Sequence, residues 1–397
     1  MSRPFTLQDV AFLTSARGDR LLNQLAAMDI TPLNLPRLLT ELRREYDPTE
    51  TSAALETAQL RRNAFDKFGA VAAHMLFTGD ALEQASDPYI RAYRARELAQ
   101  DGSTLIDACC SIGTDAFAFA ATGIEVTALD LDPVRLAMAA RNAAVLGYSV
   151  QWQQADLTEQ LPPPADALFF DPARRDADGR RVFHVQAYQP PLNMLDRWQG
   201  RYQYMRAKLA PGVTLEHIQS YGGRVRFYSV NGDLKEAELT VGESAQVTEA
   251  VLFHNGQAHH YAPTEAIDAQ TDVPSGWLCE PDPAVIRAGY VAHLAHDLHG
   301  TQLDDSIAYF CTADEPQSVW VRAWQILEWM PFHVKRLRAL LQARGIGQVT
   351  VKKRGSPLTP EALIPQLKLK GEGSCTLVLT RLRGEPIVLI CNDIAPR

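Results

Sequence analysis

One stretch, from residue 105 to residue 130, constrains the fold more than any other part of this 397-residue chain. It consists of a short apolar run, a tight turn of small residues, and an alanine-rich segment with helical periodicity that ends at Gly123. A second apolar run then ends at Asp130, which lies 23 residues after Asp107. The pattern predicts strand, turn, helix and strand, which is half of a nucleotide-binding βαβ unit.

An ordinary βαβ crossover is an alternative, because Gly113 is the one glycine in the turn. The absence of the G-x-G-x-x-G spacing also disfavours a nicotinamide dehydrogenase. A ligand site is favoured by acidic residues at the ends of four successive predicted strands: Asp107, Asp130, Asp156 and Asp171. In an open α/β sheet, ligands bind at the carboxyl ends of the strands.

These segments resemble the class I S-adenosylmethionine-dependent methyltransferases, in particular the RNA cap guanine-N2 branch of the trimethylguanosine synthase type. The resemblance implies a Rossmann-like α/β sheet, S-adenosyl-L-methionine as cofactor and methyl transfer as the activity. The matching segments are Asp107-Ala-Cys-Cys-Ser-Ile-Gly113, Ala128-Leu-Asp-Leu-Asp132-Pro, Ala155-Asp156 and Phe170-Asp171-Pro172.

The resemblance assigns cofactor contacts along this edge of the sheet. It implies that Asp107 and Gly113 border the methionine moiety, that Asp130 holds the ribose and that Asp156 faces the adenine amino group. Ser86, before the first strand, is expected at the methionine end, with a helix N-cap as the alternative. Further cofactor contacts are expected for Cys109, Ser111, which stands where the family usually has glycine, Thr114, Asp115, Leu131 and Leu157.

The segment after the fourth predicted strand is assigned to catalysis and substrate binding. The resemblance places Asp171 and Pro172 beside the methyl group, but the family's Asp-Pro-Pro-aromatic motif reads Asp-Pro-Ala-Arg here. Arg174 or Tyr188 is therefore expected to replace the stacking ring. Arginine forks match phosphate geometry, so the loop is predicted to bind substrate, with a solvated surface loop as the alternative. Its arginines are Arg174, Arg175, Arg180 and Arg181.

Composition is that of an ordinary globular protein, with 46% hydrophobic residues. The six cysteines form no C-x-x-C pair, so neither a metal site nor a disulfide scaffold is expected. No apolar run reaches 18 residues and the first 20 residues lack a hydrophobic signal core, which predicts a cytoplasmic protein without membrane contact.

Charge is distributed unevenly along the chain, which carries −8 in total. Residues 331–397 contain 12 Lys and Arg against 4 Asp and Glu, so the preceding residues carry −16. This asymmetry predicts a basic C-terminal module that docks RNA, with Lys352, Lys353 and Arg354 as substrate contacts. A solvated basic face is the alternative.

The predicted architecture has three parts. A helical region covers 1–100, a Rossmann-like methyltransferase domain covers 101–262, and after a polar linker an α+β domain covers 276–397. The last part resembles a THUMP-like domain through the segment from Val349 to Gly355. Asn231-Gly232 between alternating runs predicts a hairpin that closes the parallel sheet.

Three functions remain open from the sequence. The favoured one is an RNA N-methyltransferase that acts on guanine or another base amine, with the C-terminal domain docking the RNA. A second is a methyltransferase for a small anionic metabolite or a protein. A third is a protein that binds the cofactor or RNA without turnover, since both Ser111 and the Asp-Pro-Ala-Arg segment depart from the family pattern. The oligomeric state is left open.

Overall fold

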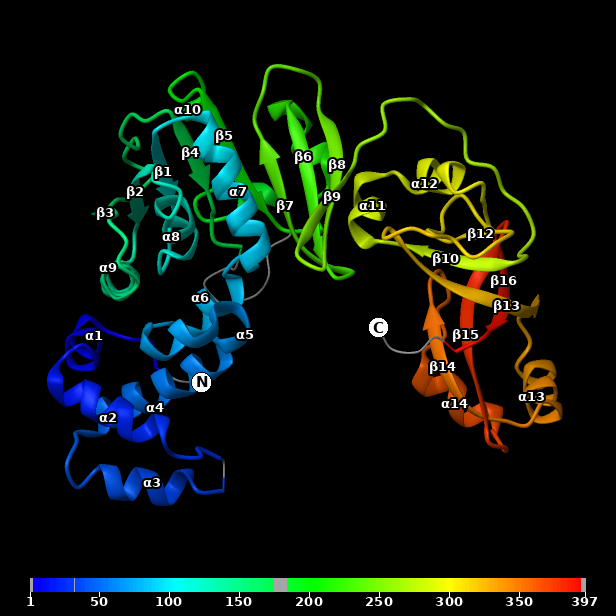
Figure 1. Cartoon of the computed structure of the whole chain (residues 1–397), viewed down its shortest axis with the longest axis horizontal. Helices are drawn as coiled ribbons and strands as arrows, with labels where there is room; N and C mark the ends of the chain where they lie inside the picture. Colours follow the sequence, from blue (N-terminus) through cyan, green and yellow to red (C-terminus); the bar gives the residue numbers. More distant parts are fainter. Residues whose placement is uncertain (1–2, 32, 175–183, 394–397) are drawn as a thin grey trace. The chain divides into compact units, whose positions relative to one another are not determined.

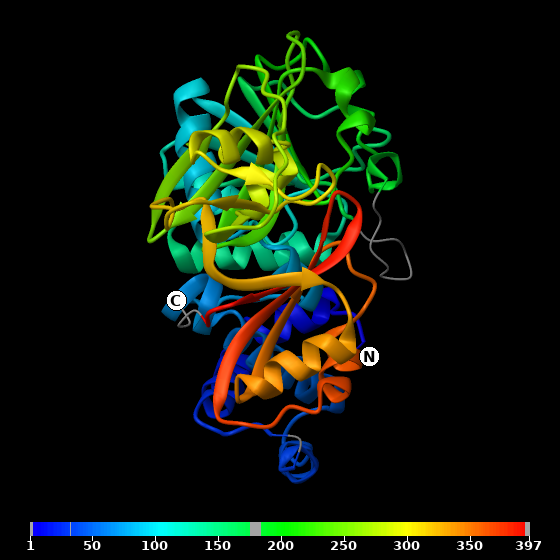
Figure 2. The same ribbon diagram turned by 90° about the vertical axis from the view of Figure 1, so that its right-hand side faces the viewer.

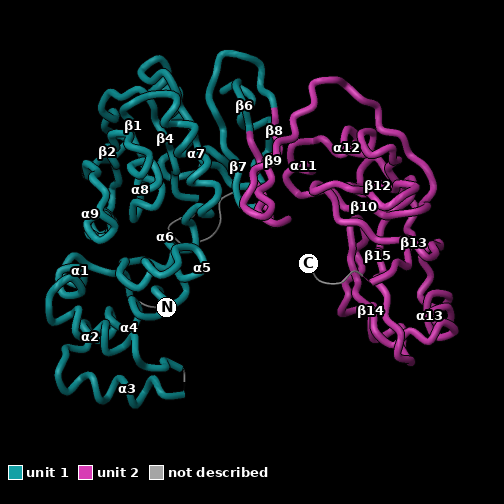
Figure 3. Tube along the Cα trace, in the orientation of Figure 1, with its two compact units in different colours: residues 1–225, 235–247 teal, residues 226–234, 248–397 magenta. Residues whose placement is uncertain are grey.

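The computed structural model describes residues 3–31, 33–174 and 184–393, and it is shown in Figure 1 and, turned by 90°, in Figure 2. The chain divides into two compact units (Figure 3). The first comprises Met1–Val225 with Lys235–Val247, and the second comprises Arg226–Leu234 with Thr248–Arg397. The limits of the three domains predicted from the sequence stay a prediction.

The N-terminal part of the first unit is helical, as predicted. Side-chain caps fix several helix starts, and an Asp-Pro pair recurs: Asp47 caps α4 and Asp87 caps α7, each followed by a proline at the first helical position. The elements are α1 (Leu7–Leu13), α2 (Ala16–Ala26), α3 (Leu35–Leu42), α4 (Pro48–Asn63), α5 (Phe65–Phe68), η1 (Gly69–His74), α6 (Gly79–Gln84) and α7 (Pro88–Asp101).

The first unit then forms the predicted α/β sheet, whose strands within this unit follow the order β3-β2-β1-β4-β5-β7. The first five strands run parallel, and β7 pairs antiparallel with β5. The elements are β1 (Thr104–Ala108), α8 (Thr114–Ala120), β2 (Glu125–Asp130), α9 (Pro133–Leu146), β3 (Gln151–Gln154), β4 (Ala167–Phe170), η2 (Val185–Ala187), α10 (Met194–Trp198), β5 (Tyr204–Leu209), η3 (Leu215–His217), η4 (Gln219–Tyr221) and β7 (Asp233–Thr240).

Two buried cores hold this unit together. One joins α7 and α8 to the strands through side chains such as Leu98, Phe119 and Phe169. The other joins the N-terminal helices to α8 and α9, where Asn142 exchanges two hydrogen bonds with the backbone of Leu76, at 2.7 and 2.9 Å. The helical region is therefore packed onto the sheet domain through α8 and α9.

The second unit is built on a seven-stranded sheet of order β11-β12-β10-β13-β16-β15-β14. Within it, β14 runs parallel to β15, and the other pairs are antiparallel. The remaining elements are β6 (Arg224–Val230), β8 (Val247–His254), β9 (Gln257–Tyr261), β10 (Trp277–Pro281), α11 (Pro283–Ala288), α12 (Val291–Asp297), β11 (Thr301–Gln302), β12 (Phe310–Thr312), β13 (Val321–Pro331), α13 (Val334–Ala343), β14 (Ile346–Lys353), α14 (Pro360–Leu367), β15 (Gly373–Leu382) and β16 (Glu385–Cys391).

Both faces of this second sheet are covered. Along β15, Val378 belongs to one apolar core while Leu377 and Leu379 belong to the other, which is the period of two expected of a strand. The core containing Leu377 and Leu379 also holds Leu337 of α13 and Leu363 of α14, so these two helices cover that face (Figure 2). This arrangement gives the α+β domain that the sequence predicted.

Two local predictions are resolved by backbone conformation. Asn231 and Gly232, which connect β6 to β7, both have positive φ, as an Asn-Gly turn requires. In the sequence, Asp282 as a cap, Pro283 after it and the stop at Gly300 predict a single helix. That prediction is wrong, because Gly289 adopts φ 84° and ends α11 with a left-handed cap before α12 begins. Within the described residues, no helix combines the length and the apolar character needed to cross a bilayer.

Candidate functional site

A cavity of about 620 Å³ lies at the carboxyl edge of the first unit's sheet, a volume ordinary for a small-molecule site. Each of the first four strands delivers a predicted acidic residue to it, so the proposed ligand edge does form one cavity. Among the residues that line it are Asp80, Gln84, Asp107, Cys109, Ser111, Thr114, Asp115, Asp130, Leu131, Arg135, Asp156, Leu157, Asp171, Ala173, Gln189, Pro190 and Pro191.

The turn between β1 and α8 is shaped by backbone in the left-handed region. Cys109, Ser111 and Gly113 have φ of 67°, 52° and 84°. A Cβ at Gly113 would lie 2.7 Å from Trp152 and 2.8 Å from Phe117, so glycine is required there by both conformation and space. Gly113 itself does not line the cavity within the described residues. Ser111 keeps the tight turn, although a side chain stands where the resembled family has glycine.

Asp130 is held rigidly at the end of β2. Its Oδ2 accepts a hydrogen bond from the backbone N–H of Ser111 at 2.7 Å, and its Oδ1 accepts one from the N–H of Asp132 at 2.9 Å. Burial raises the pKa of this carboxyl, while the two backbone donors oppose the shift. The carboxylate is thus fixed in place and can accept hydroxyl donors from the cavity side through its remaining lone pairs.

Asp107 is buried at the base of the cavity, and neither carboxylate oxygen has a hydrogen-bond partner within the described residues. Burial raises its pKa well above the ordinary value, and the negative charges of Asp115 and Asp171 raise it further. A buried carboxylate without a partner is costly, and a bound cation or donor would remove that cost. The site is therefore suited to a ligand that brings a positive charge to Asp107.

Leu131, 61% exposed, and the buried Leu157 add apolar surface to the lining near Asp156. The Asp156 Oδ1 accepts hydrogen bonds from the N–H and the Oγ1 of Thr158, at 2.9 and 2.6 Å, and these bonds hold its pKa below the usual value. Apolar side chains beside a carboxylate are the groups that suit a ring carrying an amine.

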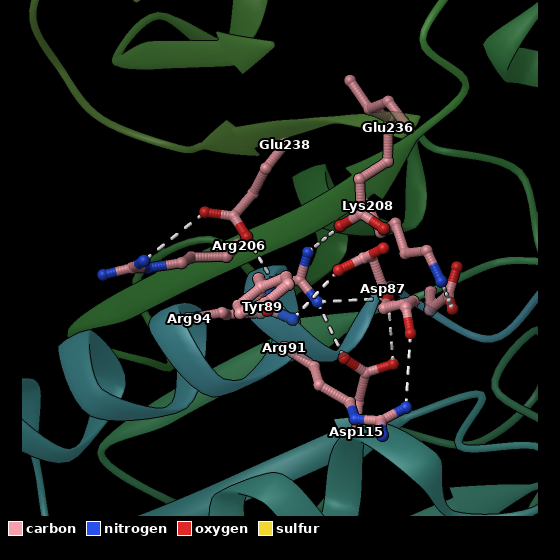
Figure 4. Close-up of polar contacts among 12 residues, drawn as sticks. Asp87, Tyr89, Arg91, Arg94, Asp115, Arg206, Lys208, Glu236 and Glu238 are labelled. Atoms are coloured by element: carbon pink, nitrogen blue, oxygen red, sulfur yellow. Dashed lines mark hydrogen bonds and ion pairs between the residues drawn. The ribbon is translucent and has the colours of Figure 1, made fainter. Parts of the chain in front are cut away.

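Asp115 belongs to a buried ion network that sequence reasoning missed (Figure 4). Arg94, fully buried on α7, bonds Asp115 at 2.7 Å and also pairs with Glu236 and Glu238 of β7. The predicted cofactor residue Ser86 lies behind the cavity wall, where its Oγ donates to Asp115 at 3.3 Å. Ser86 is not among the residues that line the cavity, and the N-cap of α7 is Asp87.

Asp171, at the end of β4, lines the cavity next to a segment that sequence reasoning also missed. Ala173 and Gln189 exchange two backbone hydrogen bonds, at 2.9 and 3.0 Å, and thereby bring Pro190 and Pro191 to the same wall. The Asp171 Oδ2 pairs with the buried ammonium of Lys208 on β5 at 2.8 Å. The predicted catalytic aspartate is therefore both exposed to the cavity and anchored from behind.

Neither replacement expected for the stacking ring lines the cavity. Tyr188 is 2% exposed and its hydroxyl accepts a hydrogen bond from the N–H of Ala210, so its ring is part of the core. Arg174 donates to the carbonyl of Leu209 at 3.2 Å instead of facing the cavity. Pro172 also lies outside the lining. The predicted substrate contacts Arg175, Arg180 and Arg181 lie outside the described residues.

The basic residues at the end of β14 line a second cavity, of about 590 Å³, within the second unit. Lys352 and Arg354 contribute to it together with Arg322, and both pair with Glu280, Arg354 at 3.6 Å. Lys352 also lies over the ring of Trp324, 4.2 Å from its centroid. The predicted contact Lys353 is exposed and does not line this cavity.

Family models match three parts of the chain. A methyltransferase domain matches residues 105–171, and a THUMP domain-like model matches residues 321–393. A domain of unknown function matches residues 6–64. The first two matches fall on the cavity-bearing sheet and on the C-terminal sheet.

Two similar proteins are both described as methyltransferases. An uncharacterized S-adenosylmethionine-dependent methyltransferase of Mycobacterium tuberculosis is 36% identical over 340 residues, which are 83% of this chain and 92% of that protein. An uncharacterized RNA methyltransferase of Streptococcus pneumoniae is 31% identical over 115 residues, 27% of this chain and 25% of that protein. The chain therefore belongs to the S-adenosylmethionine-dependent methyltransferases, and it carries a THUMP-like C-terminal domain.

A solved structure supports the fold over the whole chain. The crystal structure of a putative methyltransferase from Porphyromonas gingivalis superposes with a TM-score of 0.78 and covers 99% of this chain and 100% of that one, at 19% identity. The arrangement of helical N-terminus, class I sheet and C-terminal α+β domain is thus shared.

The cavity fits S-adenosyl-L-methionine on its own chemistry. The unpartnered carboxylate of Asp107 suits the positive charges of the cofactor's methionine end. Asp130 offers a fixed acceptor for ribose hydroxyls, and the apolar Leu157 with the carboxylate of Asp156 suits an aminopurine.

Proposed function

We propose that this enzyme N-methylates RNA, on guanine or another base amine. The observation that carries the proposal is the position of Asp171, whose carboxylate borders the cavity while one oxygen is held by Lys208. In the part of the chain that the structure describes, Oδ1 accepts no hydrogen bond. That oxygen is placed to receive an N–H from an acceptor amine and to direct the nitrogen lone pair into the cavity.

The bound cofactor supplies a methyl group on a positively charged sulfur. We assign its contacts as the resemblance implies: Asp107 and the Gly113 turn at the methionine end, Asp130 at the ribose and Asp156 at the adenine, with Ser86 supporting Asp115. Asp171 orients the amine, and its negative charge stabilises the positive charge that develops on the amine nitrogen. Catalysis here consists of positioning and exclusion of water, with no covalent intermediate on the protein.

RNA as the substrate rests on charge and on similarity. Residues 331–397 carry a surplus of eight positive charges, although the whole chain is at −8. The end of β14 places Lys352 and Arg354 in a cavity beside Trp320, an arrangement suited to phosphate and base. The relative described as an RNA methyltransferase matches part of this chain. A guanine-N2 target, as in the trimethylguanosine synthase branch, is the specific form of this proposal.

Transfer of labelled methyl groups tests the proposal. We would incubate the enzyme with methyl-labelled S-adenosylmethionine and total RNA from cells that lack the gene, and then digest the RNA to nucleosides. A labelled N-methyl nucleoside, absent with Asp171→Ala, is the expected result. The same reaction is run on the small-molecule and protein fractions of these cells. Label in one of these fractions, with none in RNA, would overturn the RNA assignment and favour the metabolite or protein alternative.

A further inference from the structure

Lys208 is a buried cation that the cofactor chemistry does not require. It lies on β5 between Ala207 and Leu209 and is 1% exposed. A buried ammonium is stable only when it is paired, and here Nζ has two acceptors. It donates to the Asp171 Oδ2 at 2.8 Å and to the carbonyl of Gln84 at 3.0 Å.

Both acceptors belong to residues that line the cavity. Gln84 is the last residue of α6, whose residues 80, 81 and 84 form the part of the lining that we call the α6 wall, and Asp171 follows β4. We propose that Lys208 is a positioning residue for methyl transfer, which ties the α6 wall to the carboxylate that orients the methyl acceptor. This inference rests on the proposed function of Asp171.

A variant of the neighbouring residue Lys67 makes it possible to test the two contacts of Lys208 separately. The Lys67 Nζ donates to the carbonyls of Leu82, Glu83 and Ala85, at 2.8, 3.2 and 3.0 Å, so it also anchors the end of α6. Within the described residues it makes no contact with Asp171. Lys67→Met therefore removes contacts to the end of α6 and leaves the Lys208–Asp171 contact in place, whereas Lys208→Met removes both the contact to α6 and the hold on Asp171.

Electrostatics support a role beyond packing. The carboxyls of Asp107, Asp115, Asp130 and Asp171 converge on the cavity. Lys208 opposes the rise in the pKa of Asp107 that burial and the other three carboxylates cause. Without this ammonium, Asp171 would lose its counter-charge while the other carboxylates of the cavity remained, and its Oδ2 would no longer be held.

A first experiment needs no methyl acceptor. Hydrogen exchange of the full-length protein should show faster exchange in residues 79–86 for both Lys208→Met and Lys67→Met. In urea unfolding, adding Asp171→Asn to Lys208→Met should recover most of the loss in midpoint concentration, whereas adding it to Lys67→Met should recover none. Additive midpoint losses for Lys208→Met and Asp171→Asn, or unchanged hydrogen exchange in Lys208→Met, would overturn the proposal even if RNA proves not to be the substrate.

A second experiment uses the RNA assay and the wild-type enzyme as reference. In Lys208→Met we expect kcat to fall about 100-fold, a loss typical of misplaced reacting groups, with S-adenosylhomocysteine affinity within about threefold. In Lys67→Met kcat should change little, because the Lys208–Asp171 contact stays in place, and in Lys208→Arg kcat should partly recover, because the positive charge is kept. An equal fall of kcat in Lys67→Met and Lys208→Met would contradict the proposal, whereas inactivity of the wild type on RNA would instead count against the proposed function.

Discussion

The two cavities of this protein differ in charge and in construction. The first is lined by aspartates at the ends of parallel strands, with Arg135 as the basic side chain among its described lining residues. The second lies in a largely antiparallel unit and is lined by Arg322, Lys352 and Arg354. Of its two acidic residues among the described lining, Glu280 and Asp282, Glu280 pairs with Lys352 and with Arg354.

This difference indicates a division of labour. An acidic, partly desolvated cavity selects a cationic small molecule through a few fixed carboxylates, and each of these should matter individually. Half-buried basic groups around a cavity attract an anionic polymer through summed charge, and single residues should matter little. The account therefore predicts large, specific effects in the first cavity and modest, salt-dependent effects in the second.

The largest effect is expected at Asp171. Asp171→Ala should reduce kcat by about 10² to 10⁴, because the acceptor amine loses its orienting group in the transition state. Cofactor affinity, measured by calorimetry, should stay within a few-fold. Equal losses in turnover and in cofactor affinity would show that Asp171 binds the cofactor, and would contradict its assignment to the methyl acceptor.

Asp130→Ala should weaken cofactor binding by about 2 to 4 kcal/mol, since a charged acceptor fixed by two backbone donors is lost. Calorimetry with S-adenosylmethionine measures this directly. Asp132→Asn is the matched control, because Asp132 lines the same cavity but its side chain caps α9. Unchanged affinity in Asp130→Ala would refute the ribose assignment.

The raised pKa of Asp107 predicts a pH dependence of cofactor binding. In the free protein the Asp107 carboxyl keeps its proton at pH values above its ordinary pKa, so the stability of the free protein falls as pH rises toward and through the raised pKa. A bound cation favours the ionised carboxylate, so binding should release a proton. Between the ordinary and the raised pKa, cofactor affinity should therefore increase with pH by up to about tenfold per pH unit. Calorimetry in buffers of different ionisation enthalpy counts the proton, and Asp107→Asn should abolish its release. Proton release that persists in this variant would assign it to another group.

The smallest effect is expected in the second unit. Replacing Lys352, Lys353 and Arg354 together by Ala should lower the magnitude of the RNA salt slope by up to about 2, at roughly 0.7 per phosphate contact. Cofactor affinity should not change. Glu280→Gln is the opposite control, because it frees Lys352 and Arg354 from their partner and should steepen the slope. A slope that neither variant alters would favour a metabolite or protein substrate.

Much of the fold and the cavity at the carboxyl edge of the sheet could be predicted from the sequence, because strand ends are local features. Asp107, Asp130, Asp156 and Asp171 each lie at or just after the end of a predicted strand, and parallel strands bring their carboxyl ends together. The helix break at Gly289 was missed because a glycine in a helical pattern can be tolerated or can cap.

The parts that were missed depend on contacts distant in sequence. Arg206 and Lys208 occupy alternate positions along β5, a pattern typical of an exposed strand face. Both are nevertheless buried, and each forms an ion pair with an acidic residue from another part of the chain. The wall at Pro190 forms only because Ala173 pairs with Gln189. Tyr188 was expected in the cavity, but its position is set by core packing. No local pattern contains this information.

The most direct test compares steady-state kinetics of two variants on RNA from cells that lack the gene. For Asp171→Ala, the account predicts a large fall in kcat with the KM for RNA nearly unchanged. For the triple Ala variant at residues 352–354, it predicts a higher, salt-sensitive KM with kcat preserved. Loss of kcat in the triple variant, or a KM effect confined to Asp171→Ala, would contradict the division between a reacting cavity and a docking surface.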